Sequence, residues 1–177
     1  MGWFLRAARH GDVDAMHEVA YAYDLGVGVA RDSRKAIRWY RKAAEAGHLG
    51  SIFNLAIAYE EGSGVRKSLV RAFRFYRRGA RLGDAACASN LGLAYIEGSG
   101  VDPSARNGLR WLRIASSRGD SKASYNLGLA YEIGHGVKPD THRAKFWYNA
   151  ASRLGSKKAR SALSRLACPK TAKRAPR

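Results

Sequence analysis

The stretch Asn54-Leu55-Ala56-Ile57-Ala58-Tyr59-Glu60-Glu61-Gly62-Ser63-Gly64-Val65 decides the fold, because the same pattern returns at 90–101 and 126–137. A looser copy occupies 18–29. Each unit closes with a glycine, and successive closing glycines are 36 residues apart. They are Gly11, Gly47, Gly83, Gly119 and Gly155. A fixed period of this size predicts a solenoid, in which each unit buries its apolar face only by stacking on a neighbour.

Each unit contains two helical patterns joined by a Gly-x-Gly-Val link. In the first complete unit, small and apolar residues recur at helical spacing from about Val13 to Leu25, after a plausible N-cap at Asp12. We call this the first-type helix. A second-type helix follows the cap at Asp32 and ends before Gly47. The two patterns repeat without insertion or deletion, so the sequence predicts an all-α chain.

The register divides the chain into repeats and predicts ten helices. We expect a half repeat at 1–11 that holds a second-type helix, and a C-terminal capping helix of the first type at 156–168. We interpret the Lys/Arg/Pro-rich end at 169–177 as a disordered basic tail. The four complete repeats between these ends are 12–47, 48–83, 84–119 and 120–155.

Composition limits the cellular setting and the class of partner. The formal net charge is +18, from 32 Lys and Arg against 14 Asp and Glu, which indicates an anionic partner. Cys87 and Cys168 are the only cysteines, too few for a disulfide framework, so we expect a reducing compartment. No apolar run reaches the length of a signal peptide or a membrane span. We therefore expect a soluble, cytoplasmic protein.

Sequence motifs for catalysis are missing. The glycine links resemble a phosphate-binding loop only in composition, because no strand precedes them and no Lys-Ser/Thr pair follows. The histidines do not recur at the period, and no carboxylate pair or Ser/His/Asp set is identifiable by spacing. We expect no enzyme activity, no metal site and no cofactor.

Two motifs carry a resemblance to a known family. They are Ala123-Leu127-Gly128-Tyr131-Gly134-Gly136-Val137 and Asp32-Lys35-Ala36-Trp39-Tyr40-Lys42-Ala43-Ala44. Over about residues 3–167 the chain resembles the Sel-one-like repeat, a relative of the tetratricopeptide repeat. The resemblance implies a right-handed α-solenoid that acts as an interaction scaffold, with first-type helices lining a concave groove for partner peptides. One cysteine-rich branch of the family has a disulfide in each helix pair and is linked to penicillin binding, and two unmatched cysteines do not fit that branch.

If the first-type helices line a groove, the residues beside their core face are candidates for partner binding. An amide side chain offers donors and an acceptor, so a column of asparagines can hydrogen-bond an extended peptide. The alternative is that these asparagines join neighbouring helices. The candidates are His17, Glu18, Phe53, Asn54, Ser89, Asn90, Tyr125 and Asn126.

The second-type helices carry arginines at helical spacing, and stacking is expected to align them on a convex face. Like charges at such spacings cost a few tenths of a kcal/mol per pair, so a partner or a compositional bias must explain them. The candidates for anion binding are Arg34, Arg38, Arg41, Arg74, Arg77, Arg106, Arg110 and Arg113.

These observations lead to one leading hypothesis and two alternatives. The leading hypothesis is a non-enzymatic scaffold that binds an acidic protein or peptide in the concave groove. The first alternative is a nucleic-acid-binding scaffold that uses the convex arginines and the basic tail. The second is a hydrolase or penicillin-binding activity, as in the cysteine-rich branch.

Overall fold

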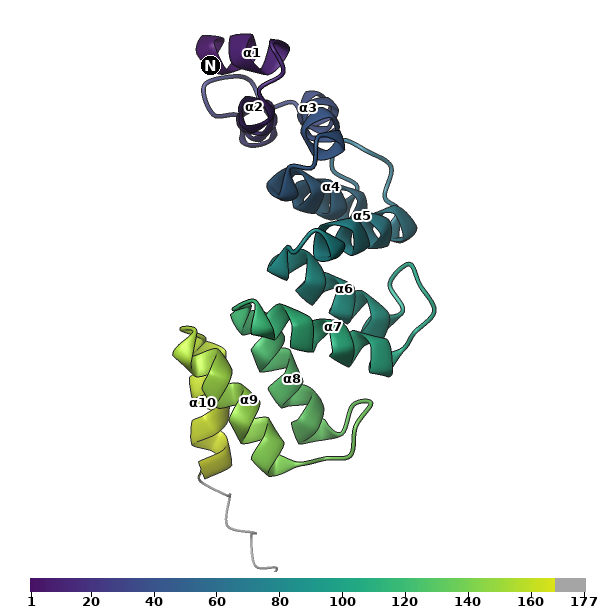
Figure 1. Cartoon of the computed structure of the whole chain (residues 1–177), viewed down its shortest axis with the longest axis vertical. Helices are drawn as coiled ribbons and strands as arrows, with labels where there is room; N and C mark the ends of the chain where they lie inside the picture. Colours follow the sequence, from purple (N-terminus) through teal and green to yellow (C-terminus); the bar gives the residue numbers. More distant parts are fainter. Residues whose placement is uncertain (168–177) are drawn as a thin grey trace, which may run out of the picture. The chain divides into compact units, whose positions relative to one another are not determined.

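The structure is a computed structural model that describes residues 1–167, and the regular structure of this part is entirely helical (Figure 1). The second-type helices are α1 (Gly2–Arg9), α3 (Ser33–Glu45), α5 (Leu69–Arg81), α7 (Ala105–Ser117) and α9 (Thr141–Arg153). The first-type helices are α2 (Val13–Leu25), α4 (Leu49–Glu61), α6 (Ala85–Glu97), α8 (Ser121–Ile133) and α10 (Lys157–Ala167). The prediction of an all-α repeat chain is confirmed. Cys168 and the basic tail predicted at 169–177 lie outside the described residues.

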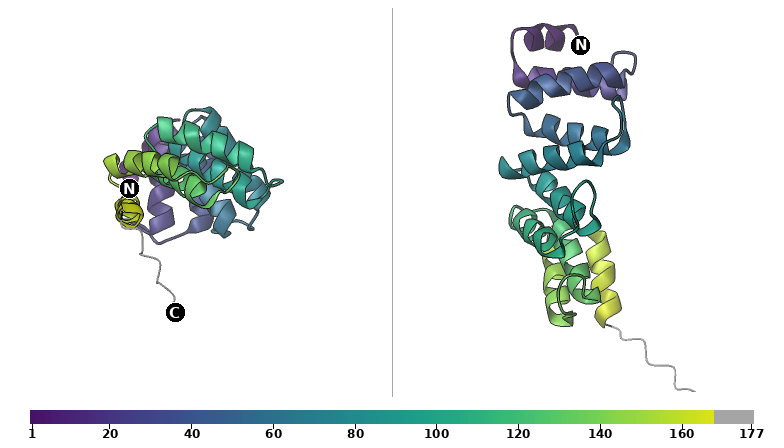
Figure 2. Two further views of the ribbon diagram at one scale, coloured as in Figure 1. Left: turned by 90° about the horizontal axis from the view of Figure 1, so that it is seen from below. Right: turned by 90° about the vertical axis from the view of Figure 1, so that its right-hand side faces the viewer.

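The helices belong to two compact units, Met1–Trp111 and a second that begins at Leu112, so the boundary falls inside α7. In the first unit each helix from α1 to α6 contacts the next one in the chain, and the right-hand view of Figure 2 shows them layered in that order. In the second unit α9 contacts both α8 and α10. Within each unit, these helices adjacent in sequence are therefore adjacent in space, as stacked repeats require.

The helix ends follow from capping residues that recur with the repeat. Asp12, Asp84 and Asp120 each accept a hydrogen bond from a backbone N–H three residues on, at the start of α2, α6 and α8. The start of α4 differs, because the imidazole of His48 takes the place of the carboxylate. All four of these first-type helices end at a glycine with a left-handed backbone, for example Gly62 at φ 86°.

Small residues let α5 and α6 approach closely. A Cβ atom added to Gly79 of α5 would overlap Sγ of Cys87 in α6, and Cys87 is fully buried. In other repeats the position of Gly79 is alanine, and the position of Cys87 is serine or alanine. Gly79 lacks the methyl group of alanine, and the space this leaves accommodates the larger side chain of Cys87. Burial raises the pKa of the Cys87 thiol, which is free and not in a disulfide.

A tyrosine of the second-type helix bonds to a carboxylate of the first-type helix in two repeats. The hydroxyl of Tyr76 donates to Glu60 at 2.5 Å, and the hydroxyl of Tyr148 donates to Glu132 at 2.6 Å. In the first complete repeat the carboxylate is Asp24, one methylene shorter, and the buried hydroxyl of Tyr40 has no hydrogen-bond partner. Burial, with Asp24 nearby, raises the pKa of Tyr40. The shorter acid leaves a buried donor unsatisfied there, which costs stability.

Substitution of Gly79 by Ala should destabilise the protein by about 1–3 kcal/mol, because the new methyl group meets Cys87. Adding Cys87→Ala should recover most of that loss, since the pair then matches Ala115 and Ala123. Urea unfolding of both single variants and of the double variant measures the coupling. Additive effects of the two substitutions would contradict the proposed contact.

Substitution of Tyr76 by Phe should cost about 1 kcal/mol, because a hydrogen bond to Glu60 is lost. The matched substitution Tyr40→Phe should be neutral or stabilising, because it removes an unsatisfied buried hydroxyl. The Asp24→Glu variant should stabilise the parent protein but not the Tyr40→Phe variant. Thermal unfolding checks all three, and equal losses from the two tyrosine substitutions would contradict this account.

Candidate partner-binding faces

The first column of predicted groove residues packs against the tyrosines of the second-type helices. The ring centroid of His17 lies 5.6 Å from that of Tyr40, and the ring of Phe53 lies 6.3 Å from that of Tyr76. In the second unit the corresponding distance from Tyr125 to Tyr148 is 5.5 Å. Ser89 is buried, so its side chain is not available to a partner in this conformation. The three rings are only half-buried and remain candidates for contact.

The second column is more accessible but also interacts with the tyrosines. Asn54 lies near the hydroxyl of Tyr40, without the geometry of a hydrogen bond, and works against the rise of the pKa of Tyr40; Asn90 has the same effect on the pKa of Tyr76. Asn126 is half-buried and Glu18 is exposed. Two of the three amides therefore face a tyrosine of the preceding repeat. This arrangement favours the alternative that the asparagines join neighbouring helices, while leaving part of each side chain exposed.

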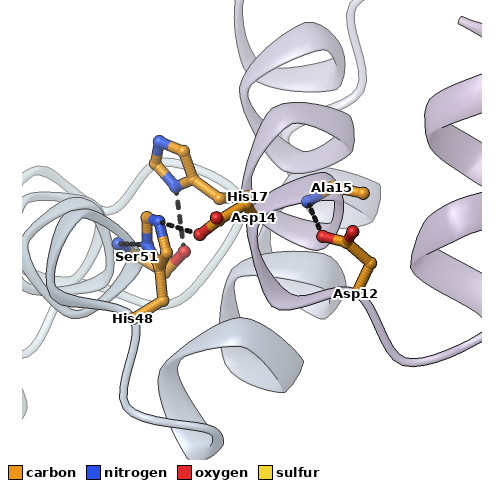
Figure 3. Close-up of polar contacts among 6 residues, drawn as sticks. All are labelled: Asp12, Asp14, Ala15, His17, His48 and Ser51. Atoms are coloured by element: carbon orange, nitrogen blue, oxygen red, sulfur yellow. Dashed lines mark hydrogen bonds and ion pairs between the residues drawn. The ribbon is translucent and has the colours of Figure 1, made fainter.

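A polar cluster between α2 and α4 was not found by sequence reasoning, because none of its histidines recurs at the period (Figure 3). His17 Nδ1 hydrogen-bonds to Ser51 Oγ at 2.9 Å, and His48 Nδ1 accepts from the backbone N–H of Ser51 at 3.1 Å. His48 Nε2 lies 3.5 Å from Asp14 Oδ1. The two imidazole rings stack at 4.3 Å, and Gly50 leaves room for them, because a Cβ there would lie 3.1 Å from His48.

The chemistry of this cluster is structural. Ser51 is fully buried, so its hydroxyl is out of reach of a substrate. Among residues 1–167 no group of three His, Cys, Asp or Glu side chains has an arrangement that holds a metal ion. Burial and the neighbouring His48 lower the pKa of His17, although Glu18 and Asp14 act in the opposite direction. Burial of His17 therefore favours its neutral form.

The predicted convex arginines separate into two groups. Arg41 donates to the hydroxyl of Tyr59 at 2.8 Å, and Arg113 donates to that of Tyr131 at 3.0 Å. Burial opposes ionisation of Tyr59, but its hydrogen bonds with arginine outweigh burial and lower its pKa. These two arginines join adjacent helices. In the described chain none of the eight predicted arginines forms an ion pair with Asp or Glu. The exposed arginines without a hydrogen bond are Arg34, Arg38, Arg74, Arg77, Arg106 and Arg110.

In the first unit positive charge is concentrated on the second-type helices, whereas in the second unit the first-type helices carry it too, with one lysine in α8 and four basic residues in α10. The first-type helices α2, α4 and α6 contain no lysine or arginine, whereas α5 contains five arginines. Helix α3 carries three arginines and two lysines. This segregation was visible in the sequence, because it needs only the helix register. The positive potential of the first unit is therefore strongest along α3 and α5 rather than along α2, α4 and α6.

Comparison with known proteins gives consistent matches. A family model described as the Sel1 repeat matches residues 1–12, 13–48, 50–84, 85–120 and 121–156. A Sel1 repeat protein from Oxalobacter formigenes is 35% identical with a TM-score of 0.80, and the match covers 86% of this chain and 63% of that one. A protective antigen of uropathogenic Escherichia coli with an SLR fold is 30% identical with a TM-score of 0.87. That match covers 92% of this chain and 35% of the antigen.

A more distant match is the cysteine-rich protein B of Helicobacter pylori, at 25% identity and a TM-score of 0.60. It covers 75% of this chain and 96% of that one. No curated protein matches the chain. The chain thus spans less than two thirds of the length of the first two solved structures. None of the helices between residues 2 and 167 has the length and hydropathy needed to cross a membrane.

The His17–His48 cluster should make stability depend on pH. Because the pKa of His17 is lower in the folded state, the stability it contributes is present above its unfolded pKa and is lost as pH falls from about 7 to 5. A double variant, His17→Phe with Ser51→Ala, carries the residues that other repeats have at the equivalent positions, Phe53 and Ala123. Its free energy of unfolding should depend less on pH. Urea unfolding at several pH values measures it.

His48→Asp serves as a second variant, because Asp is the cap of the other first-type helices and does not titrate in this range. It should keep α4 capped at low pH. Equal loss of stability on acidification in the parent and in both variants would rule out the cluster as the source.

Proposed function

Because this chain belongs to the Sel1 repeat family, we propose that it is a non-enzymatic scaffold that binds an acidic protein or peptide. The resemblance drawn from the sequence is confirmed by these matches. Proteins built from Sel1 repeats are generally protein-interaction scaffolds without enzyme activity. A repeat scaffold offers an extended surface on which several contacts act together, so it needs no deep active site.

The main support for an acidic partner is the set of exposed arginines that have no carboxylate partner. The ion pairs elsewhere in residues 1–167 are Lys35 with Asp32, Arg143 with Asp140, His48 with Asp14 and Arg165 with Glu132, so none of them uses the predicted arginines. Arg38, Arg74 and Arg110 occupy equivalent positions in successive repeats and have no such neighbour. Guanidinium groups bind carboxylates through two parallel hydrogen bonds. The second-type helices therefore provide donors that an acidic partner can use.

The first-type face has a different role in this proposal. Its half-exposed rings and amides, which include Phe53, Asn54 and Asn90, suit the uncharged backbone and apolar side chains of a partner. The sequence predicts that the acidic partner lies in the groove. We propose instead that its acidic side chains contact the arginine-bearing second-type helices. A partner long enough to contact both faces would combine the two modes.

Nucleic acid is the second candidate, because the same exposed arginines could bind phosphates. Phosphate contacts release counterions, so an interface with six to ten contacts loses about a thousandfold or more in affinity between about 50 and 200 mM salt. A protein partner with a few carboxylates and some uncharged contacts is less sensitive to salt. Salt dependence therefore distinguishes the two candidates.

The purified, nuclease-treated protein should bind a fluorescein-labelled peptide in which glutamate alternates with serine. It should bind the matched peptide with glutamine in place of glutamate at least about tenfold more weakly, because the guanidinium–carboxylate bonds are lost. Fluorescence anisotropy measures both affinities, with random single- and double-stranded oligonucleotides as comparison. Equal affinity for the two peptides contradicts the proposal. Tight oligonucleotide binding that persists at about 200 mM salt would favour nucleic acid instead.

A further inference from the structure

A surface pocket of about 440 Å³ lies between the C-terminal end of α3 and one face of α5, within the first unit. The α3 side consists of the last residue of the helix and the turn that follows it. The α5 side is mostly arginine. The lining residues are Glu45, Ala46, Gly47, Arg74, Arg77, Arg78, Arg81 and Leu82.

The arginines converge because of their spacing on a helix that is fixed from behind. Counting from Arg74, they stand at i, i+3, i+4 and i+7, which places them on one face of α5. The opposite face is buried, and it includes Tyr76 and Gly79. Gly79 packs directly against Cys87 of α6. The backbone that carries the arginines is therefore rigidly held, and only their side chains need to be ordered by a ligand.

The four arginines have different tasks. Arg78 Nη2 donates to the backbone oxygen of Ala44 at 2.6 Å, in the last turn of α3. The guanidinium of Arg77 lies over the ring of Phe73 at 5.9 Å. Arg74 and Arg81 are exposed and make no hydrogen bond or ion pair with any residue of 1–167. The donors of these two arginines are available to a ligand.

Stability does not explain this arrangement. Like charges three or four residues apart on a helix destabilise it by a few tenths of a kcal/mol per pair. Among described residues only Glu45 contributes a carboxylate to the lining, and it forms no ion pair with these arginines. An anion in the pocket would relieve the repulsion and satisfy the forked donors of Arg74 and Arg81.

We infer that this pocket between α3 and α5 binds the carboxylate side chains of an acidic protein segment, with Arg74 and Arg81 as the principal donors. The inference rests on the proposed function and assigns its anionic contact to one place. A protein carboxylate fits better than a nucleic-acid backbone, because Glu45 and the negative end of α3 border the pocket on one side. They tolerate a single carboxylate aimed at the arginines but repel a continuous chain of phosphates.

The test uses two variants with the same change in charge. Arg74→Gln with Arg81→Gln removes the two lining arginines that make no hydrogen bond or ion pair with any residue of 1–167, and Arg6→Gln with Arg9→Gln removes two exposed arginines of α1 that lie outside the lining. Gln and Arg have similar helix propensities, so both variants should fold with unchanged thermal stability. Binding of the glutamate–serine peptide is then measured for the parent protein and for both variants at one salt concentration.

The pocket variant should lose about tenfold or more in affinity, because two charge-assisted interactions are removed, and the control variant about twofold or less. Equal losses in the two variants would overturn the pocket, although the proposed function would stand. A parent protein that does not prefer glutamate to glutamine would overturn the proposed function, and the pocket with it. An oligonucleotide is tested in the same way. If it displaces the peptide from the parent protein, binds more tightly than the peptide, and loses about tenfold in affinity in the pocket variant, the pocket is a nucleic-acid site instead.

Discussion

Close packing of helices through alanine and glycine is the constraint on which the rest of this structure depends. Interior positions tolerate almost no change in volume unless a neighbour compensates. Gly79 with Cys87 shows this compensation in the first unit, and Gly128 beneath the ring of Tyr148 shows it in the second. Because each interface is formed with the next helix in sequence, one period of 36 residues, as from Gly11 to Gly47, maintains all of them. A stacked array of this kind presents its functional groups on an extended surface.

The distribution of charge follows from this geometry. A second-type helix such as α5 buries Ala72, Phe73, Tyr76, Gly79 and Ala80 along one stripe, so its remaining positions face solvent. The first-type helices use more of their surface in packing and carry no lysine or arginine in α2, α4 or α6. Within the first unit, the positive charge is therefore concentrated on the second-type helices. Exposed arginines without carboxylates nearby then distinguish this surface from an ordinary solvated face, on which charges of both signs alternate.

The sequence predicted the helices well, because period, caps and glycine links all indicate the same register. It predicted Asp12 and Asp32 as caps, and both side chains accept the expected backbone hydrogen bond. It could not predict features that depend on how side chains of different repeats meet. The stacked pair of His17 and His48 is one example, since neither residue recurs. The unsatisfied Tyr40 hydroxyl is another, since it depends on a single methylene at Asp24. Helical spacing predicts the arginine columns, but the approach of Arg78 to the end of α3, which completes the pocket, depends on how two repeats pack.

The most direct test of the central claim is an NMR titration of the arginine Nε–Hε groups with the glutamate–serine peptide. The account predicts that the resonances of Arg74 and Arg81 shift first and most, because their guanidinium groups are free donors beside the α3–α5 pocket. Arg41, which already bonds to Tyr59, should shift little. Uniform small shifts of all exposed arginines, or shifts confined to backbone groups of α2, α4 and α6, would contradict it.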